Sequence, residues 1–128
     1  MGELNEEEMQ YFLEGCRRFD LGRHWDSHES WEDLWILLKK RKEFNQAKIV
    51  QGLIQTAALL YNYARQKKRG VQLGWEKLEK KLVDVSSYQH IDISKHLDQI
   101  RVFFENVDHW SLDPQTVTLP LVDDRTYE

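Results

Sequence analysis

The chain of 128 residues is long enough for one hydrophobic core and too short for two independent domains. Its 41% hydrophobic and 31% charged side chains predict a soluble globular protein and not a disordered or membrane one. The formal net charge of −4 creates no overall attraction to nucleic acid or to an anionic membrane. We therefore expect neither a nucleic-acid nor a membrane partner.

Cysteine usage and the first residues bear on location. Cys16 is the one cysteine, so no internal disulfide is expected and a reducing compartment is favoured. The opening residues lack a signal-peptide pattern, and no apolar stretch reaches the length of a membrane span. These features predict a cytoplasmic protein. Two basic runs, 39–42 and 67–69, are interpreted as solvated helix ends, because cations stabilise terminal carbonyl groups.

The first half of the chain predicts three helices. Asn5, three residues before Glu8, has the spacing of a capping box, and the helix after it is expected to run to about Asp20. A second helix should begin near Arg23 and end in the basic run, with residues 43–45 as the connection. The third helix follows and has a broad apolar face. It is expected to lie at the centre of the fold.

The second half predicts two more helices and a tail. Gly70 is interpreted as the end of the third helix, and apolar residues at helical spacing up to Leu82 predict a fourth. A fifth should begin after a cap at Asp92 or Ser94. Prolines and β-branched residues then predict an extended segment. The expected fold is all-α, a single-domain antiparallel helical bundle of about five helices over residues 1–110 with an extended C-terminal tail over 111–128.

The second helix carries ionisable residues on the side that its aromatic residues predict to be buried. Advancing about 100° per residue places Trp25, Trp31 and Trp35 on one arc. His28 and Glu32 fall inside that arc, one turn apart, whereas the serines and aspartates of the helix fall outside it. Because burying an unpaired carboxylate costs several kcal/mol, Glu32 is expected to have a partner.

Three kinds of partner are open for this carboxylate: His28 as an imidazolium, the amides of the third helix, or a bound cation. Gln51, Gln55 and Asn62 lie within roughly 40° of one another on the third helix, flanking its apolar arc. The alternatives are therefore a buried hydrogen-bonded network without a ligand, a metal or catalytic site, and an exposed pair with no special role.

Of these alternatives, the most specific is that the pair binds a divalent metal, zinc or manganese. Imidazole nitrogen and carboxylate oxygen are standard ligands, so His28 and Glu32 would supply two, with His24 or Glu29 as a third. The pattern differs from the zincin motif His-Glu-x-x-His, because Glu32 stands at the second histidine position. The other histidines are interpreted as surface residues, and Cys16 as a buried, inert thiol. The remaining histidines are His90, His96 and His109.

Two blocks of the sequence resemble a known family. They are Phe19-Asp20-x-Gly22 with Trp25-Asp26-x-His28-Glu29-x-x-Glu32-x-x-Trp35, and Gln51-Gly52-Leu53-Ile54-Gln55-x-Ala57-Ala58-x-x-Tyr61. In order and spacing, over about residues 9–82, they resemble the bacterial and archaeal domain-of-unknown-function family 309. The resemblance implies a small all-helical fold and the label of a predicted metal-dependent hydrolase. Two positions depart from the family pattern: His24 replaces an aromatic residue, and Asn62 replaces a histidine.

Two functional hypotheses follow. As an enzyme, the protein would use Glu29 and Glu32 as catalytic carboxylates, with a divalent metal held by His28 and Glu32. Gln51 and Gln55, with Trp25 and Trp35, would bind an unidentified small molecule. The alternative is a non-catalytic structural or interaction module, whose polar cluster fixes the packing of two helices and whose outer surface serves a partner or a second copy.

Overall fold

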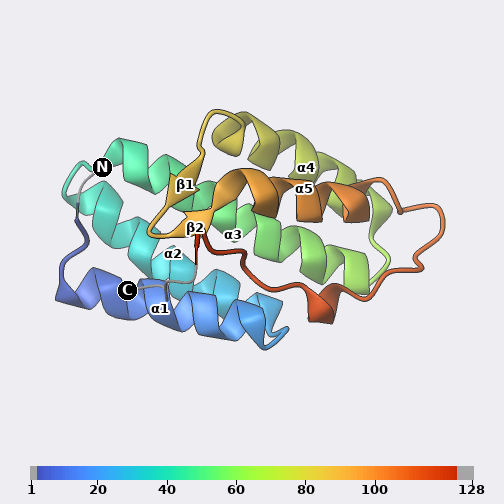
Figure 1. Ribbon diagram of the computed structural model, residues 1–128, viewed down its shortest axis with the longest axis horizontal. Helices are drawn as coiled ribbons and strands as arrows, with labels where there is room; N and C mark the ends of the chain where they lie inside the picture. The colour runs from blue at the N-terminus through green and yellow to red at the C-terminus, as the bar shows by residue number, and fades with distance from the viewer. Residues whose placement is uncertain (1–2, 124–128) are drawn as a thin grey trace.

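The computed structural model describes residues 3–123, and in that range the chain forms five α-helices, one β-hairpin and a 3₁₀ turn (Figure 1). The predicted all-α fold is therefore confirmed, with a very small sheet added. The elements are α1 Glu6–Asp20, α2 His24–Lys40, α3 Phe44–Ala64, α4 Lys68–Leu82, β1 Ser87–Tyr88, β2 Ile91–Asp92, α5 Ile93–Phe104 and η1 Pro114–Thr116.

Two predicted helix starts are confirmed by their caps. Asn5 Oδ1 accepts a hydrogen bond from the Glu8 amide at 2.8 Å, and Glu8 Oε1 accepts from the Asn5 amide at 3.0 Å. Asp92 caps α5 by accepting from the Lys95 amide at 3.0 Å. In each case a side chain satisfies an amide that the helix itself leaves unpaired.

The first four helices pack as consecutive neighbours, and later elements close the bundle. In Figure 1, α1 runs along the bottom, α3 crosses the middle, and α5 lies in front with the tail passing back between α3 and α1. The tail is anchored, because Asp20 Oδ1 accepts a hydrogen bond from the Leu119 amide at 2.8 Å and Val117 and Leu119 are buried. No helix among the described residues is both long and apolar enough to cross a membrane.

One predicted helix boundary is wrong. The third helix was expected to end at Gly70, but α3 ends at Ala64 and Gly70 lies in the first turn of α4. The glycine serves close packing, since a Cβ at this position would lie 2.9 Å from the side-chain nitrogen of Asn62. The turn is made instead at Gln66, whose φ of 55° is left-handed.

The β-hairpin was not expected from the sequence. Ser87 pairs with Asp92 and Tyr88 with Ile91, which leaves Gln89 and His90 as the two-residue turn. Both turn residues have positive φ, 49° and 71°, as a type I′ hairpin requires. Strands of two residues are too short to show the alternation that predicts a strand.

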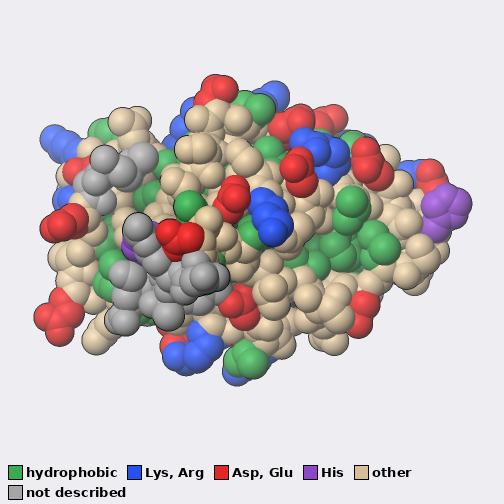
Figure 2. Space-filling view, viewed as in Figure 1, with side chains coloured by type: hydrophobic (Ala, Val, Ile, Leu, Met, Phe, Trp, Pro, Cys, Tyr) green, Lys and Arg blue, Asp and Glu red, His purple; other side chains and the backbone are tan. Residues whose placement is uncertain are grey.

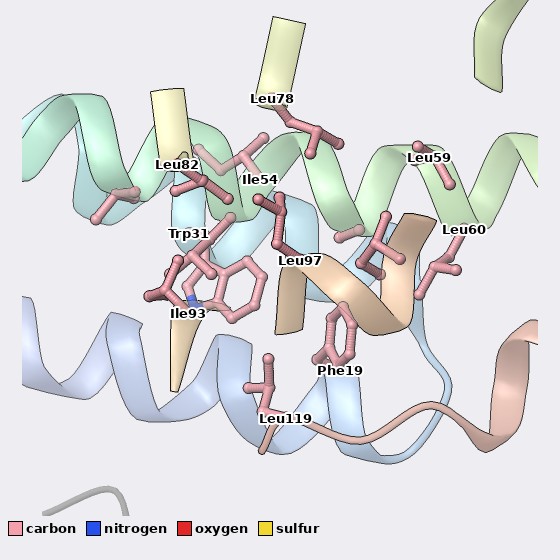
Figure 3. Packing of buried hydrophobic residues seen from close by; sticks show 14 of the residues in the cluster. Phe19, Trp31, Ile54, Leu59, Leu60, Leu78, Leu82, Ile93, Leu97 and Leu119 are labelled. Atoms are coloured by element: carbon pink, nitrogen blue, oxygen red, sulfur yellow. The ribbon is translucent and has the colours of Figure 1, made fainter. Parts of the chain in front are cut away.

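All five helices contribute to the core. Figure 3 shows Trp31, Phe19 and Leu97, from three different helices, converging on one another. The Trp31 indole nitrogen donates a hydrogen bond to the Phe12 carbonyl at 3.2 Å. This close approach of α2 to α1 depends on Gly15, because a Cβ there would lie 2.3 Å from the indole of Trp31.

Candidate functional site

The predicted burial of Glu32 is wrong. Its side chain is 51% exposed, whereas that of His28 is 16% exposed. The two still face each other, with His28 Nδ1 at 3.6 Å from Glu32 Oε1, just beyond hydrogen-bond distance. His28 Nδ1 is buried and has no hydrogen-bond partner among the described residues. The pair that was expected to face inward thus consists of a mostly buried imidazole, His28, and a solvent-exposed carboxylate, Glu32.

The predicted buried face of α2 is only partly right: Trp31, Leu34 and Leu38 are buried as expected, but the face is shifted around the helix. Ser27 and Ser30, which the helical wheel placed outside, are buried, while Trp25 is 48% exposed. Helix α1 comes so close at Gly15 that small hydroxyl side chains fit there: Ser27 Oγ donates to the Gly15 carbonyl at 2.8 Å. Arg18 Nη1 in turn donates to Ser30 Oγ at 2.9 Å.

The predicted amide partners do not bond to α2. Gln51 and Gln55 lie half-buried on α3, and Gln55 Oε1 accepts a hydrogen bond from Lys81 Nζ of α4 at 3.2 Å. No hydrogen bond joins either amide to His28 or Glu32 within residues 3–123. Of the other predicted site residues on α2, Glu29 is exposed. Trp35 is half-buried and packs against the core, with Lys39 Nζ at 5.2 Å from its ring centroid.

The donor set does not fit a protein-held zinc or manganese ion. No three or more His, Cys, Asp or Glu side chains in the described range are grouped so that they could hold a metal. His28 and Glu32 supply two donors, whereas zinc sites in proteins use three or four. The metal therefore stays a prediction from the sequence pattern, with two ligands instead of three.

An aromatic stack stands beside this pair. The indole of Trp25 lies between the imidazole of His28 and the phenol ring of Tyr61, with centroid distances of 4.8 and 5.1 Å. Arg65 extends the stack, because its guanidinium lies 5.2 Å from the centroid of Tyr61. A large, half-exposed ring is thus held in one orientation by residues of α2 and α3.

The stack borders a surface hollow of about 330 Å³ between the start of α2 and the end of α3. Arg23 lies at its rim and is paired with Asp26 at 2.7 Å. Arg23 is also the N-cap residue of α2 and makes no side-chain hydrogen bond to the first turn. We call this space the first hollow; its lining consists of Gly22, Arg23, His24, Trp25, Asp26, Tyr61, Ala64, Arg65 and Gln115.

A second hollow, of about 310 Å³, adjoins the first and shares Ala64 and Gln115 with it. Two of its residues have left-handed backbones: Gln66, with φ of 55°, and Trp110, with φ of 53°. The Trp110 ring lies 4.9 Å from that of Tyr63. The second hollow is lined by Tyr63, Ala64, Gln66, Trp110, Leu112, Asp113, Pro114 and Gln115.

Two buried histidines flank Phe19 behind the first hollow. His24 and His96 have ring centroids 5.3 and 5.4 Å from that of Phe19, and burial lowers the pKa of each to about 4. His96, which was predicted to lie on the surface, is fully buried, with its Nε2 at 2.9 Å from Thr56 Oγ1. Since Thr56 donates its own hydroxyl proton to the Leu53 carbonyl, His96 Nε2 is the donor to Thr56.

These features describe a small all-α protein with two joined, ligand-sized hollows on its surface. Residues 12–73 match the family model described as a domain of unknown function (DUF309), which supports the resemblance seen in the two sequence blocks. No curated protein and no solved structure matches the chain. Of the residues on which the family resemblance rests, Gly22, Trp25, Asp26 and Tyr61 all line the first hollow.

Several lining residues escaped the sequence reasoning. Arg65 and Gln66 follow directly after α3, whereas the sequence analysis placed them inside the third helix. Trp110 and Gln115 come from the tail and meet the helices only through folding. The sequence offered one indication of these residues: Trp110 lies in a segment without helical periodicity. A large apolar side chain in such a segment suggests a contact with another part of the fold or with a ligand.

Proposed function

We propose that this protein is a non-catalytic binding module that takes a small ligand, with a planar ring and an anionic group, in the two adjoining hollows. The observation that carries the proposal is the convergence of Gly22, Trp25, Asp26 and Tyr61, all part of the family motifs, on the first hollow. The start of α2 and the end of α3 thus bring residues from both sequence blocks to the edge of one open space.

Aromatic side chains would hold the planar part of the ligand. Trp25 and Tyr61 border the first hollow, and Tyr63 and Trp110 border the second. A ring packed against each of these faces gains roughly 0.5–1.5 kcal/mol beyond the burial of its area. Each hollow, at about 310 to 330 Å³, has the size of a site for a small molecule.

Positive charge at the rim would hold the anionic part. The Arg65 guanidinium forms no ion pair with a carboxylate in the described part of the chain and is oriented by the ring of Tyr61. Arg23 is fixed by Asp26 at the uncapped start of α2, where the first amides of the helix favour a negative ligand.

Backbone strain supports the same location. A left-handed backbone costs a residue with a side chain on the order of 1 kcal/mol, and for a bulky residue such as Trp110 it is a genuine outlier. The left-handed backbone of Gln66 ends α3, whereas Trp110 bears this cost in a segment outside the helices; both residues line the second hollow. Strained residues cluster where function requires a particular side-chain position.

Binding is favoured over hydrolysis because the carboxylates predicted to be catalytic do not reach this space. Neither Glu29 nor Glu32 lines either hollow, and Asp26 is neutralised by Arg23. We also propose a cytoplasmic location, on the ground that the one thiol of the chain, Cys16, is buried and has no disulfide partner.

The test uses the indole N–H signals of the five tryptophans in a ¹H–¹⁵N NMR spectrum. Titration with benzoate, and separately with adenosine monophosphate, should move the signals of Trp25 and Trp110, which line the hollows. The signal of Trp31 should stay in place, because its N–H is bonded to Phe12 inside the core.

A matched pair of variants completes the test. Arg65→Gln should weaken binding of both probes about tenfold, the value of one charge-assisted contact of about 1.4 kcal/mol. Arg17→Gln, which removes an exposed arginine of α1 paired with Glu14, should leave binding unchanged. If millimolar probe moves no tryptophan signal, or moves all five alike, the hollows are not the ligand site.

A further inference from the structure

The positive charge of this acidic protein is concentrated in one segment. Residues 39–82 hold 12 of the 18 Lys and Arg residues but only 3 of the 22 Asp and Glu residues, a charge of +9 in a chain of net −4. This segment forms the end of α2, all of α3 and all of α4. On the face seen in Figure 2, where α5 and the tail lie in front, acidic and basic side chains are interspersed.

The fold gathers lysines from three helices into one strip. Lys39 Nζ of α2 lies 5.2 Å from the ring centroid of Trp35 and 5.7 Å from that of Phe44, the first residue of α3. Lys48 follows Phe44 by four residues and so lies on the same face of α3. The end of α4 comes alongside, because Leu82 packs against Gly52.

Three lysines of α4 continue the strip. Lys77, Lys80 and Lys81 all lie on the last two turns of α4, and Lys77 precedes Lys81 by one turn of the helix. Burial and the positive charges of Lys77, Lys48 and Lys80 lower the pKa of Lys81, so each of these three lysines is within electrostatic reach of Lys81. Lys81 Nζ donates to Gln55 Oε1 of α3 at 3.2 Å. We call this surface the lysine strip; it consists of Lys39, Lys48, Lys77, Lys80 and Lys81 with the rings of Trp35 and Phe44.

The charges of the strip are not neutralised from within the chain. None of its five ammonium groups forms an ion pair with a carboxylate in residues 3–123, whereas Lys68, outside the strip, pairs with Asp108. Like charges held together lower stability, so lysines that have no carboxylate partner are suited to an anion from outside.

The aromatic rings beside the lysines indicate which kind of polyanion the strip binds. Phe44 is 57% exposed and lies directly beside Lys39, and Lys48 follows on the same helix face. Cations that meet phosphates, next to exposed rings on which bases stack, are the combination that binds single-stranded nucleic acid. We propose that the lysine strip binds single-stranded nucleic acid, without sequence preference.

This proposal departs from the expectation of no nucleic-acid partner. That expectation rested on the net charge and on the basic runs as separate helix ends, whereas the strip is made mostly of lysines outside those runs. It does not depend on the ligand hollows, which lie at the opposite ends of α2 and α3. Failure of one proposal therefore leaves the other standing.

The test measures binding of a fluorescein-labelled thymidine dodecamer by fluorescence anisotropy, over a series of sodium chloride concentrations. About four phosphate contacts give a slope of log K against log salt of roughly −2.8. Lys48→Gln with Lys77→Gln should weaken binding about tenfold at low salt and reduce the slope by about 1.4. Phe44→Ala should weaken binding with the slope unchanged, because it removes stacking and not charge.

The control variant, Lys67→Gln with Lys95→Gln, removes the same charge from exposed lysines outside the strip and should bind as the parent does. Circular dichroism melting shows whether each variant remains folded. Equal loss in both double variants, or no loss in either, would overturn the proposal. So would a Phe44→Ala variant that binds unchanged, or binding to phosphatidylserine vesicles or polyglutamate as tight as to the dodecamer.

Discussion

The indole of Trp25 lies almost parallel to the imidazole of His28, with an interplanar angle of 9° and ring centroids 4.8 Å apart. The two residues are three apart on α2, so the stack is built into the helix itself. It presents a half-exposed tryptophan in a fixed orientation at the edge of the first hollow.

The stack predicts a coupling between these two side chains. In a double-mutant cycle of Trp25→Ala and His28→Ala, measured by urea denaturation, we expect an interaction free energy of about 0.5–1.5 kcal/mol. The matching cycle of His28→Ala and Glu32→Ala should give less than about 0.5 kcal/mol, because Glu32 is half-exposed. A larger value for the second cycle would make the ion pair the dominant contact.

Acid should destabilise the protein through its two buried histidines. The folded pKa of both His24 and His96 is about 4, against 6.5 for the ordinary group, so the unfolded chain binds more protons between these values. Stability should be complete above about pH 6.5 and fall towards pH 4, with a limiting slope of about 2.7 kcal/mol per pH unit. Urea denaturation at a series of pH values measures this loss.

Substitution of one buried histidine tests whether these histidines, and not the overall charge of the protein, cause the loss of stability in acid. His96→Leu keeps Thr56 satisfied through the Leu53 carbonyl and should reduce the limiting slope by about half. His109→Leu, at an exposed position, should leave the slope as it is. An unchanged slope in the His96 variant would assign the acid sensitivity to other groups.

Two glycines should respond oppositely to alanine. Gly15→Ala is expected to lower the free energy of unfolding by about 1–3 kcal/mol, because the new Cβ would lie 2.3 Å from the indole of Trp31. Gly74→Ala, inside α4, should raise it by about 1 kcal/mol, since its nearest neighbour is 4.0 Å away and alanine favours the helix. Thermal unfolding of both variants tests whether Gly15→Ala lowers the stability and Gly74→Ala raises it.

Metal addition tests the two-ligand geometry at His28 and Glu32. Protein purified without a histidine tag should keep its melting temperature when micromolar zinc or manganese is added, because two donors hold these ions weakly. A tightly held ion at 100 times its dissociation constant would add about 2.7 kcal/mol of stability. If metal raises the melting temperature of the parent protein but not that of the His28→Ala variant, His28 is a ligand of a metal site.

The sequence predicted those features that depend on neighbouring residues. The cap formed by Asn5 and Glu8 and the cap at Asp92 are local, and both are present. The order and approximate bounds of the helices follow from the same kind of signal, because helical periodicity is read over a single segment. The end of α3 was misplaced because Gly70 lies in the first turn of α4, close to the side chain of Asn62, and does not make the turn.

The candidate site was predicted less well, because it depends on how helices face one another. The inward face of α2 was assigned from its tryptophans, but Gly15 of α1 draws the serines inward and leaves Trp25 at the surface. The hollows combine α2 and α3 with Trp110 and Gln115 of the tail. No periodic pattern links segments that far apart in the chain.

The hydrogen bond between Asp20 and the amide of Leu119 joins two residues that are 99 positions apart in the sequence. Leu119 and Val117 both contribute to the buried interior. During synthesis, the interior around Phe19 therefore stays incomplete long after α1 itself has been made. A product that stops before Val117 would expose apolar surface to chaperones and proteases.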